Sequence, residues 1–205
     1  CKRKKIDFLC TPFDLKSLND LRSIGEKKIK ISSCNFNNTI FIEQAIKYKF
    51  ELLLSTGMSD ELEIDNTVNI IKKKKAKFLL FQCTSDYPAS IEMSNIKVLE
   101  KYKKFNVPLG YSDHTRDNIS AIGSIFLGAK VVEKHFTLNK KMPGIDQIAS
   151  INPKELRILK KDLINASISL GRSEKQLNKK ILNNKLTMCK SLVAKKTIKK
   201  NEKLT

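Results

Sequence analysis

Short apolar runs that alternate with amphipathic segments constrain the fold of this chain most strongly. Each run ends in polar or small residues, and the segment after it carries apolar residues at three- and four-residue spacing, the pattern of a helix packed on one face. Six such units follow one another, with strands predicted at residues 6–12, 29–33, 51–57, 77–88, 107–112 and 129–137. Because the runs are apolar on both faces, they predict buried parallel strands joined by helical crossovers.

Residues typical of helix ends flank several of the predicted helices. Ser59 or Asp60 can cap the start of one helix, and Pro153 lies in the first turn of another. Gly25 and Gly171 are suited to the C-terminal ends of two helices. The six predicted helices span residues 14–25, 39–49, 60–75, 94–105, 117–128 and 152–171.

The position of the polar residues separates two architectures, an open doubly wound sheet and a (β/α)8 barrel. In every unit the polar residues gather at the carboxyl end of the strand, in the sequences TP, SS, STG, TSDYP, SDHT and KHFT. A barrel uses that end of every strand, whereas an open sheet concentrates its site at one switch point. No glycine-rich dinucleotide or phosphate-loop motif occurs. We therefore favour the barrel, as its strands 3–8 without the first two, because six strands do not close an eight-stranded barrel.

The pattern changes after Gly171. Residues 172–190 are polar and rich in lysine, with no strand signal, and predict a linker. Residues 191–205 begin a new alternating segment, which predicts the start of a second domain. The expected organisation is a partial barrel domain at 1–171, a linker at 172–190 and the beginning of another domain at 191–205. Since the chain starts at Cys1 rather than at methionine, we expect a fragment.

The formal net charge of +19 raises the question of nucleic-acid binding. Only five of the 40 basic residues are arginines, and arginine is the side chain that recognises phosphate and guanine through paired hydrogen bonds. The lysines are spread along the chain, so solvated helix faces account for most of the charge. We expect no nucleic-acid partner; a polyanion-binding surface stays open as a nonspecific side effect.

Cysteine usage and hydropathy indicate the compartment. The five cysteines are scattered and form no CxxC pair, which favours free thiols in a reducing compartment over disulfides or a zinc site. No apolar run approaches the roughly 18 residues of a membrane span, and no secretory signal opens the chain. These observations predict a cytoplasmic protein with no membrane partner.

The only two histidines, His114 and His135, lie at the carboxyl ends of two successive predicted strands. Adjacent parallel strands are about 4.8 Å apart, so both imidazoles could reach one divalent ion. His114 follows Asp113 directly, and His135 comes two residues after Glu133. The alternative is that the histidines are two unrelated polar residues. We favour the shared cation site.

Lys30 and Asp146 are two further candidates for chemistry. Lys30 interrupts an otherwise apolar strand, and a buried ammonium without a partner is costly, which favours an anionic ligand beside it. The alternative is an exposed strand edge. Pro143 and Gly144 would project Asp146 across the mouth of the barrel, where it could bind a polyol or act as an acid or base; it could equally be an ordinary turn residue.

Seven segments together resemble the sialic acid synthase family, in order and over nearly the whole chain. The most specific are GYSDHT and EKHFT followed by PGID. The others are TPFDL, KISS, LLLSTGMSDELEI, QCTSDYP and SLVAKKTIKKNEKLT. The resemblance implies a (β/α)8 barrel followed by an antifreeze-like (SAF) domain, so that residues 191–205 would begin the SAF domain, and a homodimer at full length. It also implies an enzyme that condenses phosphoenolpyruvate with an N-acetylated hexose, giving a nonulosonic acid and phosphate for surface polysaccharides.

The same resemblance implies roles for ten residues of this chain. His114 and His135 would hold Mn2+ or Mg2+ and, with Asp146, form the catalytic group. The residues at positions where the family contacts phosphoenolpyruvate are Thr11, Lys30, Ser33, Ser55 and Ser112. Those at positions where it contacts the sugar are Ser85, Tyr87 and Asp146.

Several positions depart from the family pattern. Cys34 and Asn35 stand where a glycine and an acidic residue are usual, Gln82 replaces a common histidine, and Ile145 replaces a proline. The resemblance also implies that two strands and most of the SAF domain lie outside these residues, so we expect the chain alone to be weakly active or inactive. Two alternatives stay open: a barrel aldolase that uses Lys30 as a Schiff base, and an inactive fragment or degenerate paralogue with a binding role.

Overall fold

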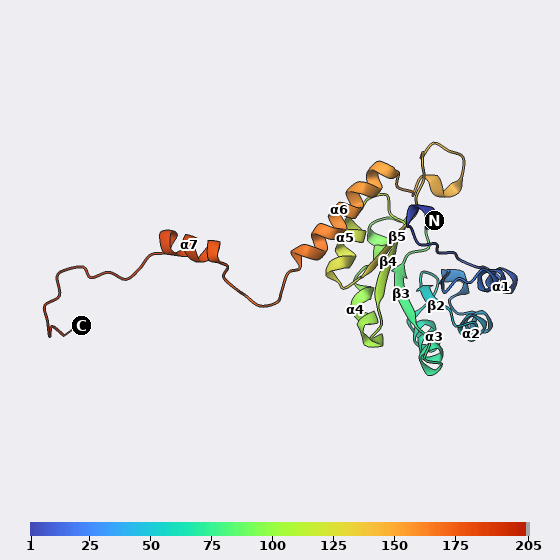
Figure 1. Ribbon diagram of the computed structural model, residues 1–205, viewed down its shortest axis with the longest axis horizontal. Coiled ribbons are helices and arrows are strands. Elements are labelled where there is room, and N and C mark those ends of the chain that lie inside the picture. Colours follow the sequence, from blue (N-terminus) through green and yellow to red (C-terminus); the bar gives the residue numbers. More distant parts are fainter. Residues whose placement is uncertain (204–205) are drawn as a thin grey trace. The chain divides into compact units, whose positions relative to one another are not determined.

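The computed structural model describes residues 1–203, and the chain divides into one unit at residues 1–170 and another from residue 171 onward. The first unit contains a single parallel sheet with the strand order β1-β2-β3-β4-β5 (Figure 1). The strands are β1 (Lys28–Ile31), β2 (Glu51–Ser55), β3 (Phe78–Cys83), β4 (Leu109–Asp113) and β5 (Val131–Lys134). The strand order never reverses, whereas a doubly wound sheet reverses at its switch point. The sheet therefore has the topology of a barrel segment.

Helices follow each strand and lie around the outside of the sheet (Figure 1). The helices of the first unit are α1 (Leu15–Ser23), α2 (Thr39–Lys47), α3 (Glu61–Lys73), α4 (Val98–Tyr102), α5 (Ile119–Phe126) and α6 (Pro153–Ser169). Short 3-10 turns add η1 (Lys2–Lys4), η2 (Ser33–Asn35), η3 (Glu92–Ser94), η4 (Lys103–Phe105) and η5 (Ile145–Gln147). The predicted alternation of strands and helices is confirmed from residue 14 to residue 170.

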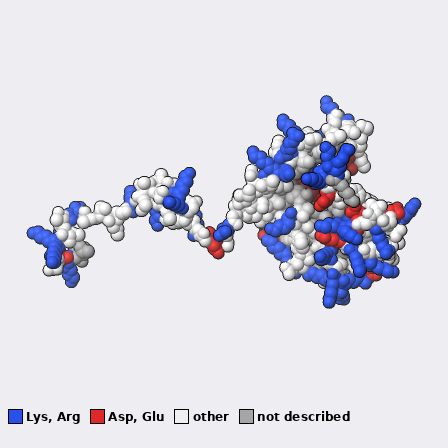
Figure 2. Space-filling view, in the orientation of Figure 1, with Lys and Arg blue, Asp and Glu red and all other residues white. Residues whose placement is uncertain are grey.

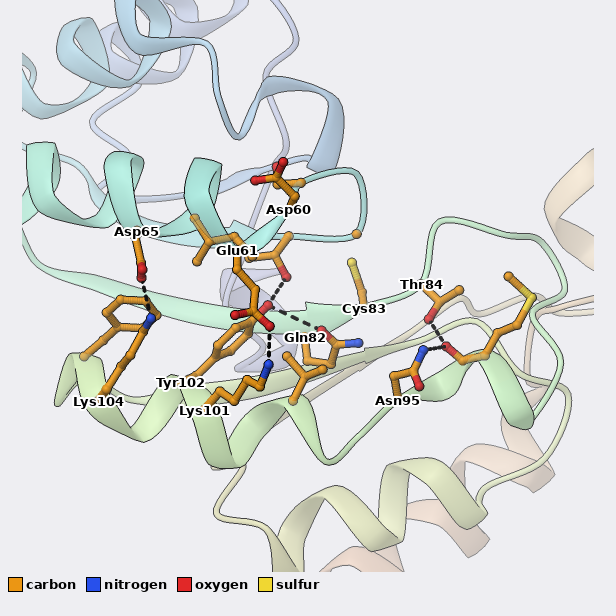
Figure 3. Close-up of a pocket in the computed structure, with 17 residues that line it drawn as sticks. Asp60, Glu61, Asp65, Gln82, Cys83, Thr84, Asn95, Lys101, Tyr102 and Lys104 are labelled. Atoms are coloured by element: carbon orange, nitrogen blue, oxygen red, sulfur yellow. Dashed lines mark hydrogen bonds and ion pairs between the residues drawn. The ribbon is translucent and has the colours of Figure 1, made fainter.

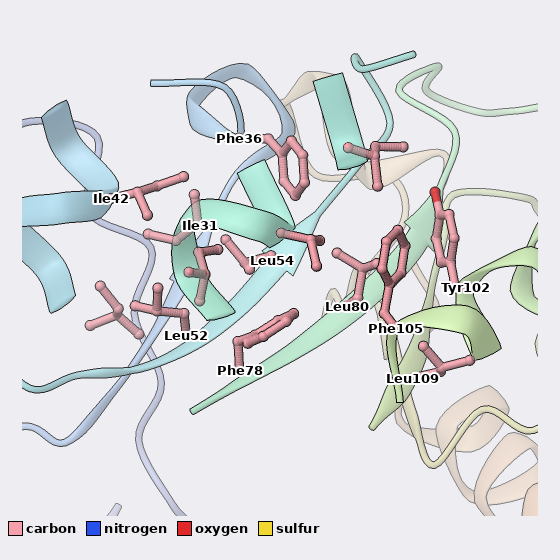
Figure 4. Close-up of a cluster of buried hydrophobic side chains, with 14 of the residues drawn as sticks. Ile31, Phe36, Ile42, Leu52, Leu54, Phe78, Leu80, Tyr102, Phe105 and Leu109 are labelled. Atoms are coloured by element: carbon pink, nitrogen blue, oxygen red, sulfur yellow. The ribbon is translucent and has the colours of Figure 1, made fainter. Parts of the chain in front are cut away.

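One face of the sheet packs against these helices and forms the core (Figure 4). Ile31, Leu54 and Leu80 lie opposite one another on neighbouring strands, and none of them is exposed to solvent. They pack with helix residues such as Ile42. Burying each such side chain contributes roughly 1.5–3 kcal/mol, so this outer face supplies most of the stability of the unit.

The helix ends confirm the residues expected to cap them. Asp60 accepts a hydrogen bond from the Glu63 amide while the Glu63 side chain accepts one from the Asp60 amide, a complete capping box. Asn152 forms the same arrangement at the start of α6, with Pro153 at the first helical position. Gly25 follows α1 with a φ of +83°, a conformation that glycine adopts without strain.

The prediction of a strand at residues 6–12 is wrong. This segment makes one ladder-like hydrogen bond to the sheet, from the Lys30 amide to the Cys10 carbonyl at 3.0 Å. Ile6, Phe8 and Leu9 are 66%, 45% and 43% exposed. A single bond does not make a strand, and no element of the described chain covers these apolar side chains. The described residues therefore contain five strands of a barrel rather than six.

Two other expectations need correction. The helix expected at 94–105 is reduced to α4, because Asn95 and Asn106 adopt left-handed conformations on either side of it and of η4. The second unit contains a helix that was not expected, α7 (Lys179–Met188), whose start is capped by Asn178. Residues 190–203 contain no helix or strand, and residues 204–205 of the expected SAF segment lie outside the described residues.

Charge and hydropathy of the surface agree with a solvated exterior. Figure 2 shows lysine and arginine side chains scattered over the visible face, with acidic side chains among them. Within residues 1–203, no helix is both long and apolar enough to cross a bilayer.

Candidate functional site

A cleft of about 410 Å³ lies at the carboxyl ends of the strands. Nine of the ten residues singled out from the sequence line it: Thr11, Lys30, Ser33, Ser55, Ser85, Tyr87, Ser112, His114 and His135. The tenth, Asp146, lies beside the cleft, with its Oδ2 at 3.8 Å from Nδ1 of His135. Residues from every strand of the sheet, and from the loops that follow them, thus meet in one place.

The two histidines are direct neighbours. Their ring centroids are 5.2 Å apart and the ring planes are inclined by 62°. Nδ1 of His114 is 2.6 Å from the carbonyl oxygen of Thr84, which assigns the proton to Nδ1 and leaves the lone pair on Nε2. The two rings are therefore close enough for the shared site that the sequence predicts.

The electrostatics around His114 favour the neutral imidazole. Burial lowers the pKa of His114, and the nearby His135 lowers it further, which together outweigh the hydrogen bond to Thr84. Tyr87 covers both rings, with its centroid 4.3 Å from that of His114 and 5.5 Å from that of His135. Burial also raises the pKa of the Tyr87 phenol, which stays protonated at neutral pH.

Lys30 has a protein partner that the sequence did not predict. The side chain is inside the sheet, 7% exposed, so the alternative of an exposed strand edge is wrong. Its ammonium donates to Oε1 of Glu133 at 2.7 Å, and the Ser112 hydroxyl donates to the same oxygen at 2.6 Å. Burial by itself would raise the pKa of Glu133, but the charge and hydrogen bonds of Lys30 and Ser112 outweigh it and lower that pKa. The cleft therefore holds an ionised carboxylate next to an ammonium.

Ser33, Ser55 and Ser85 present hydroxyl groups to the cleft, and Gly57 lies beside them. The Gly57 amide donates to the Ser33 hydroxyl at 3.1 Å, and the hydroxyls of Ser55 and Ser85 are buried without a hydrogen-bond partner in the described chain. A Cβ atom on Gly57 would lie 2.5 Å from Ser85 Oγ and 2.7 Å from Cys83 Sγ. Only glycine lets the backbone approach these groups so closely. Unsatisfied buried hydroxyls beside a backbone amide are suited to an oxyanion.

Glu133 and Gly57 are the residues of the cleft whose roles the sequence interpretation missed. Glu133 could have been found from strand alternation, since residues two apart on a strand share a face and His135 was already placed in the cleft. Gly57 stood in the quoted STG motif, but its contacts with Cys83 and Ser85 come from a different strand. No local pattern indicates that contact.

The histidine pair fits a divalent cation by the chemistry of its donors. Imidazole ligands of metals usually donate their second ring N–H to a carbonyl or carboxylate, as His114 does to Thr84. Within residues 1–203, no three histidine, cysteine, aspartate or glutamate side chains are grouped closely enough to hold a metal. The chain would thus supply two ligands and leave the other positions to substrate or water, as open catalytic sites do.

A second cleft, of about 460 Å³, lies between α3 and α4 (Figure 3). Its ionisable side chains are paired across it, Lys101 with Glu61 and Lys104 with Asp65. The Tyr102 hydroxyl is 2.9 Å from Thr56 Oγ1. None of the ten predicted residues lines this cleft. The lysines of this cleft are thus already paired with carboxylates. We therefore place the candidate active site in the cleft at the strand ends.

Comparisons with known proteins agree on one family. The model of the NeuB family matches residues 1–175. The N,N'-diacetyllegionaminic acid synthase of Campylobacter jejuni is 40% identical over 98% of this chain, and that of Legionella pneumophila is 36% identical over 83%. The chain covers 61% and 50% of these two relatives, so it spans half to three fifths of their length.

Solved structures show the same fold. The N-acetylneuraminic acid synthetase of Leptospira borgpetersenii, a crystal structure in complex with citrate, matches 91% of this chain with a TM-score of 0.84 and 32% identity, and 67% of its own chain is covered. A truncated 3-deoxy-D-arabino-heptulosonate 7-phosphate synthase from Thermotoga maritima matches 83% of this chain and 69% of its own, with a TM-score of 0.70 and 15% identity. The latter likeness concerns the fold alone.

Proposed function

The chain belongs to the NeuB family, and from this premise we propose that it carries the strand-end site of a synthase that joins phosphoenolpyruvate to an N-acetylated hexose. The products would be a nonulosonic acid and inorganic phosphate, in the synthesis of surface polysaccharide. One observation carries the proposal: nine of the residues expected from the resemblance line a single cleft, in a chain whose residues 1–175 match the family model.

The hexose would be N-acetylmannosamine or one of the diacetamido sugars that lead to legionaminic and pseudaminic acids. The diacetamido sugar of the legionaminic type is the first candidate, because a relative named N,N'-diacetyllegionaminic acid synthase shares 40% of the aligned residues. A relative named pseudaminic acid synthase shares 34%.

Phosphoenolpyruvate would bind between Lys30 and the hydroxyls of Ser33 and Ser55. Ser33 and Ser55 line the cleft and would receive one anionic group, with the Gly57 amide holding the Ser33 hydroxyl and Thr11 at the rim. Lys30 and Ser112 would lie beside the other anionic group, while Glu133 holds both in place. This arrangement argues against a Schiff base at Lys30, because its ammonium is already bound to a carboxylate.

The hexose would lie across Tyr87, near Ser85 and Asp146, with its open-chain aldehyde toward the histidines. A divalent cation, Mn2+ or Mg2+, bound by Nε2 of His114 and by His135 would polarise that aldehyde as a Lewis acid. C3 of the enol attacks the aldehyde carbon, water adds at C2, and the C–O bond breaks to release phosphate. Asp146, at 3.8 Å from His135, would orient that ring and contact the sugar hydroxyls.

Parts of the proposal concern the whole protein. The division of the chain at residue 170 is consistent with a barrel domain at 1–171, a linker at 172–190 and the beginning of an SAF domain at 191–205. A homodimer without nucleic-acid or membrane partners, and a cytoplasmic location, follow from the resemblance and the composition.

Phosphate release is the decisive test. The full-length gene product should release phosphate from phosphoenolpyruvate with Mn2+ and at least one of the three sugars, and not with mannose, which lacks the acetamido group. Borohydride in the presence of pyruvate should not attach carbon to Lys30. Absence of product with every sugar, or a trapped Lys30 adduct, would contradict the proposed reaction.

A further inference from the structure

A buried ion pair lies directly behind the two histidines. Nζ of Lys134 is 2.6 Å from Oδ2 of Asp113, and the two side chains are 3% and 0% exposed. Asp113 and Lys134 face each other in the last pair of residues that joins β4 to β5. His114 and His135 are the next residue on each strand.

Because side chains alternate along a strand, the Asp113–Lys134 pair lies on the other face of the sheet from the proposed active site. Ser112 and Glu133 point into the cleft and bond to each other, so Asp113 and Lys134 extend toward the helix-covered face, although part of Lys134 also borders the cleft. A well-packed apolar pair would serve folding as well as a buried ion pair. Stability alone therefore does not account for these two charges.

The hydrogen bonds of the pair are complete and span one turn of the chain. The Lys134 ammonium uses its three donors on Asp113 Oδ2, the Thr115 carbonyl at 2.7 Å and the Asp117 carbonyl at 2.8 Å. Oδ1 of Asp113 accepts from the amide and the hydroxyl of Thr115, at 2.9 and 2.8 Å. The turn that contains His114 is thus tied to the residue that precedes His135.

One ion can bridge the two imidazoles only if the distance between their ligand nitrogens lies in a narrow range. Metal–nitrogen bonds of about 2.1 Å place two ligand nitrogens roughly 3 Å apart, with little tolerance. Both histidines lie beyond the last ladder pair, where the strand hydrogen bonds no longer set this distance. The ring centroids are 5.2 Å apart, a distance that permits such a bridge.

We propose that the Asp113–Lys134 ion pair is the positioning element of the cation site, which sets the separation of His114 and His135 through the backbone. The inference rests on the proposed function, in which these histidines are the protein ligands of a divalent cation. In this role Asp113 and Lys134 act through the backbone and are not themselves ligands of the ion.

The test replaces both charges at once, so that no buried charge is left unpaired. Asp113→Leu combined with Lys134→Met should fold and keep most of its thermal stability, yet bind Mn2+ at least about tenfold more weakly in calorimetric titration, an effect of the size seen when outer-shell partners of metal ligands are removed. The matched control is Asp65→Leu with Lys104→Met, an exposed pair with the same 2.6 Å separation. It should bind Mn2+ as the wild-type chain does.

A second measurement needs no metal. The chain has only two histidines, so the imidazole resonances in a 15N-labelled sample are readily assigned. In the double variant, and in the conservative Asp113→Asn, the imidazole resonances of the two histidines should shift or broaden. In the control variant the same resonances should stay as in the wild type. This arm applies even if the double variant fails to fold, because Asp113→Asn keeps the shape and the acceptor for Thr115 and leaves the Lys134 ammonium its two carbonyl acceptors.

The outcomes separate the two proposals. If a folded pair variant keeps wild-type Mn2+ affinity and wild-type imidazole resonances, the pair is merely structural and this inference is wrong. If the wild-type chain binds no Mn2+, or if His135→Ala binds it equally well, the proposed cation site fails instead, and the positioning role falls with it.

Discussion

The two faces of the sheet are built from alternate residues of the same strands, yet they have opposite chemistry. On the outer face Ile31, Leu54 and Tyr111 pack under helices and are almost wholly buried. On the inner face Lys30, Ser112 and their neighbours line a cleft open to solvent. The difference shows that stability and chemistry are supplied by largely separate sets of side chains within one sheet. Apart from the Asp113–Lys134 pair, which we propose positions the histidines, mutations on one face should leave the other function nearly intact.

Leu80→Ala should produce the largest effect and confine it to stability. Leu80 is fully buried on the outer face, and removing its side chain leaves a cavity that costs about 2–5 kcal/mol of the free energy of unfolding. Urea denaturation would measure the loss, and Mn2+ titration of the folded protein should show wild-type affinity. A reduced Mn2+ affinity at temperatures where the variant is folded would break the separation of the faces.

His135→Ala should weaken metal binding and leave stability almost unchanged. Losing one of two proposed ligands should weaken Mn2+ binding by more than roughly 100-fold, the upper range for loss of an outer-shell partner. Because the side chain is about one third exposed, the melting temperature should hardly move. His135→Gln serves as a control for side-chain volume and should weaken binding similarly; Mn2+ affinity equal to wild type in both variants would contradict the shared site.

Gly57→Ala should have a smaller effect, again on the inner face. The added methyl would displace Ser85 and Cys83, and we expect phosphoenolpyruvate to bind about tenfold more weakly, equivalent to about 1.4 kcal/mol. Gly123→Ala is the matched control, since its Cβ would meet only the end of the Ile96 side chain on the helix side. Equal phosphoenolpyruvate affinity of both variants in calorimetry would show that Gly57 does not shape the anion site.

The smallest effect should come from the buried phenols of the outer face. Their contribution to the pH dependence of stability should appear only in alkali. Burial raises the pKa of Tyr102 and of Tyr111 to about 12, above the ordinary value of 10.0. In the folded state these phenols hold their protons longer than in the unfolded state, so their stabilisation is complete below pH 10 and is lost as the pH rises toward 12. Denaturation at increasing pH should show this loss, and Tyr111→Phe should lose less stability across that window. If the stability of Tyr111→Phe fell with pH as steeply as that of the wild type, the pKa shift that we attribute to burial of Tyr111 would be contradicted.

Much of the fold follows from local pattern. The alternation of apolar runs predicts the parallel strands and their helices, and Asp60, Pro153 and Gly25 mark helix ends as expected. The strand expected at residues 6–12 fails because an apolar run becomes a strand only where neighbours offer a ladder, and that segment receives one hydrogen bond. The helix α7 was missed because its polar composition resembles a linker.

The site was predictable in membership but not in its internal pairing. Motif and strand-end position brought together the ten residues, of which nine line the cleft. The partner of Lys30 within the chain is Glu133, which lies 103 positions away in the sequence, and no local pattern indicated this contact. The same holds for Asp113 and Lys134, which are adjacent to the histidines but whose contact depends on the register of two strands.

By itself, the sequence determined which residues alternate between core and cleft, because periodicity is a property of near neighbours along the chain. It also determined the family to which the chain belongs, through motifs at the strand ends. Only the tertiary structure decided that the two imidazoles lie 5.2 Å apart, that Lys30 is already paired with Glu133, and that the residues preceding the two histidines form a buried ion pair. The physical reason is that each of these contacts joins different strands, and their distances depend on how the sheet is assembled rather than on the residues next to them.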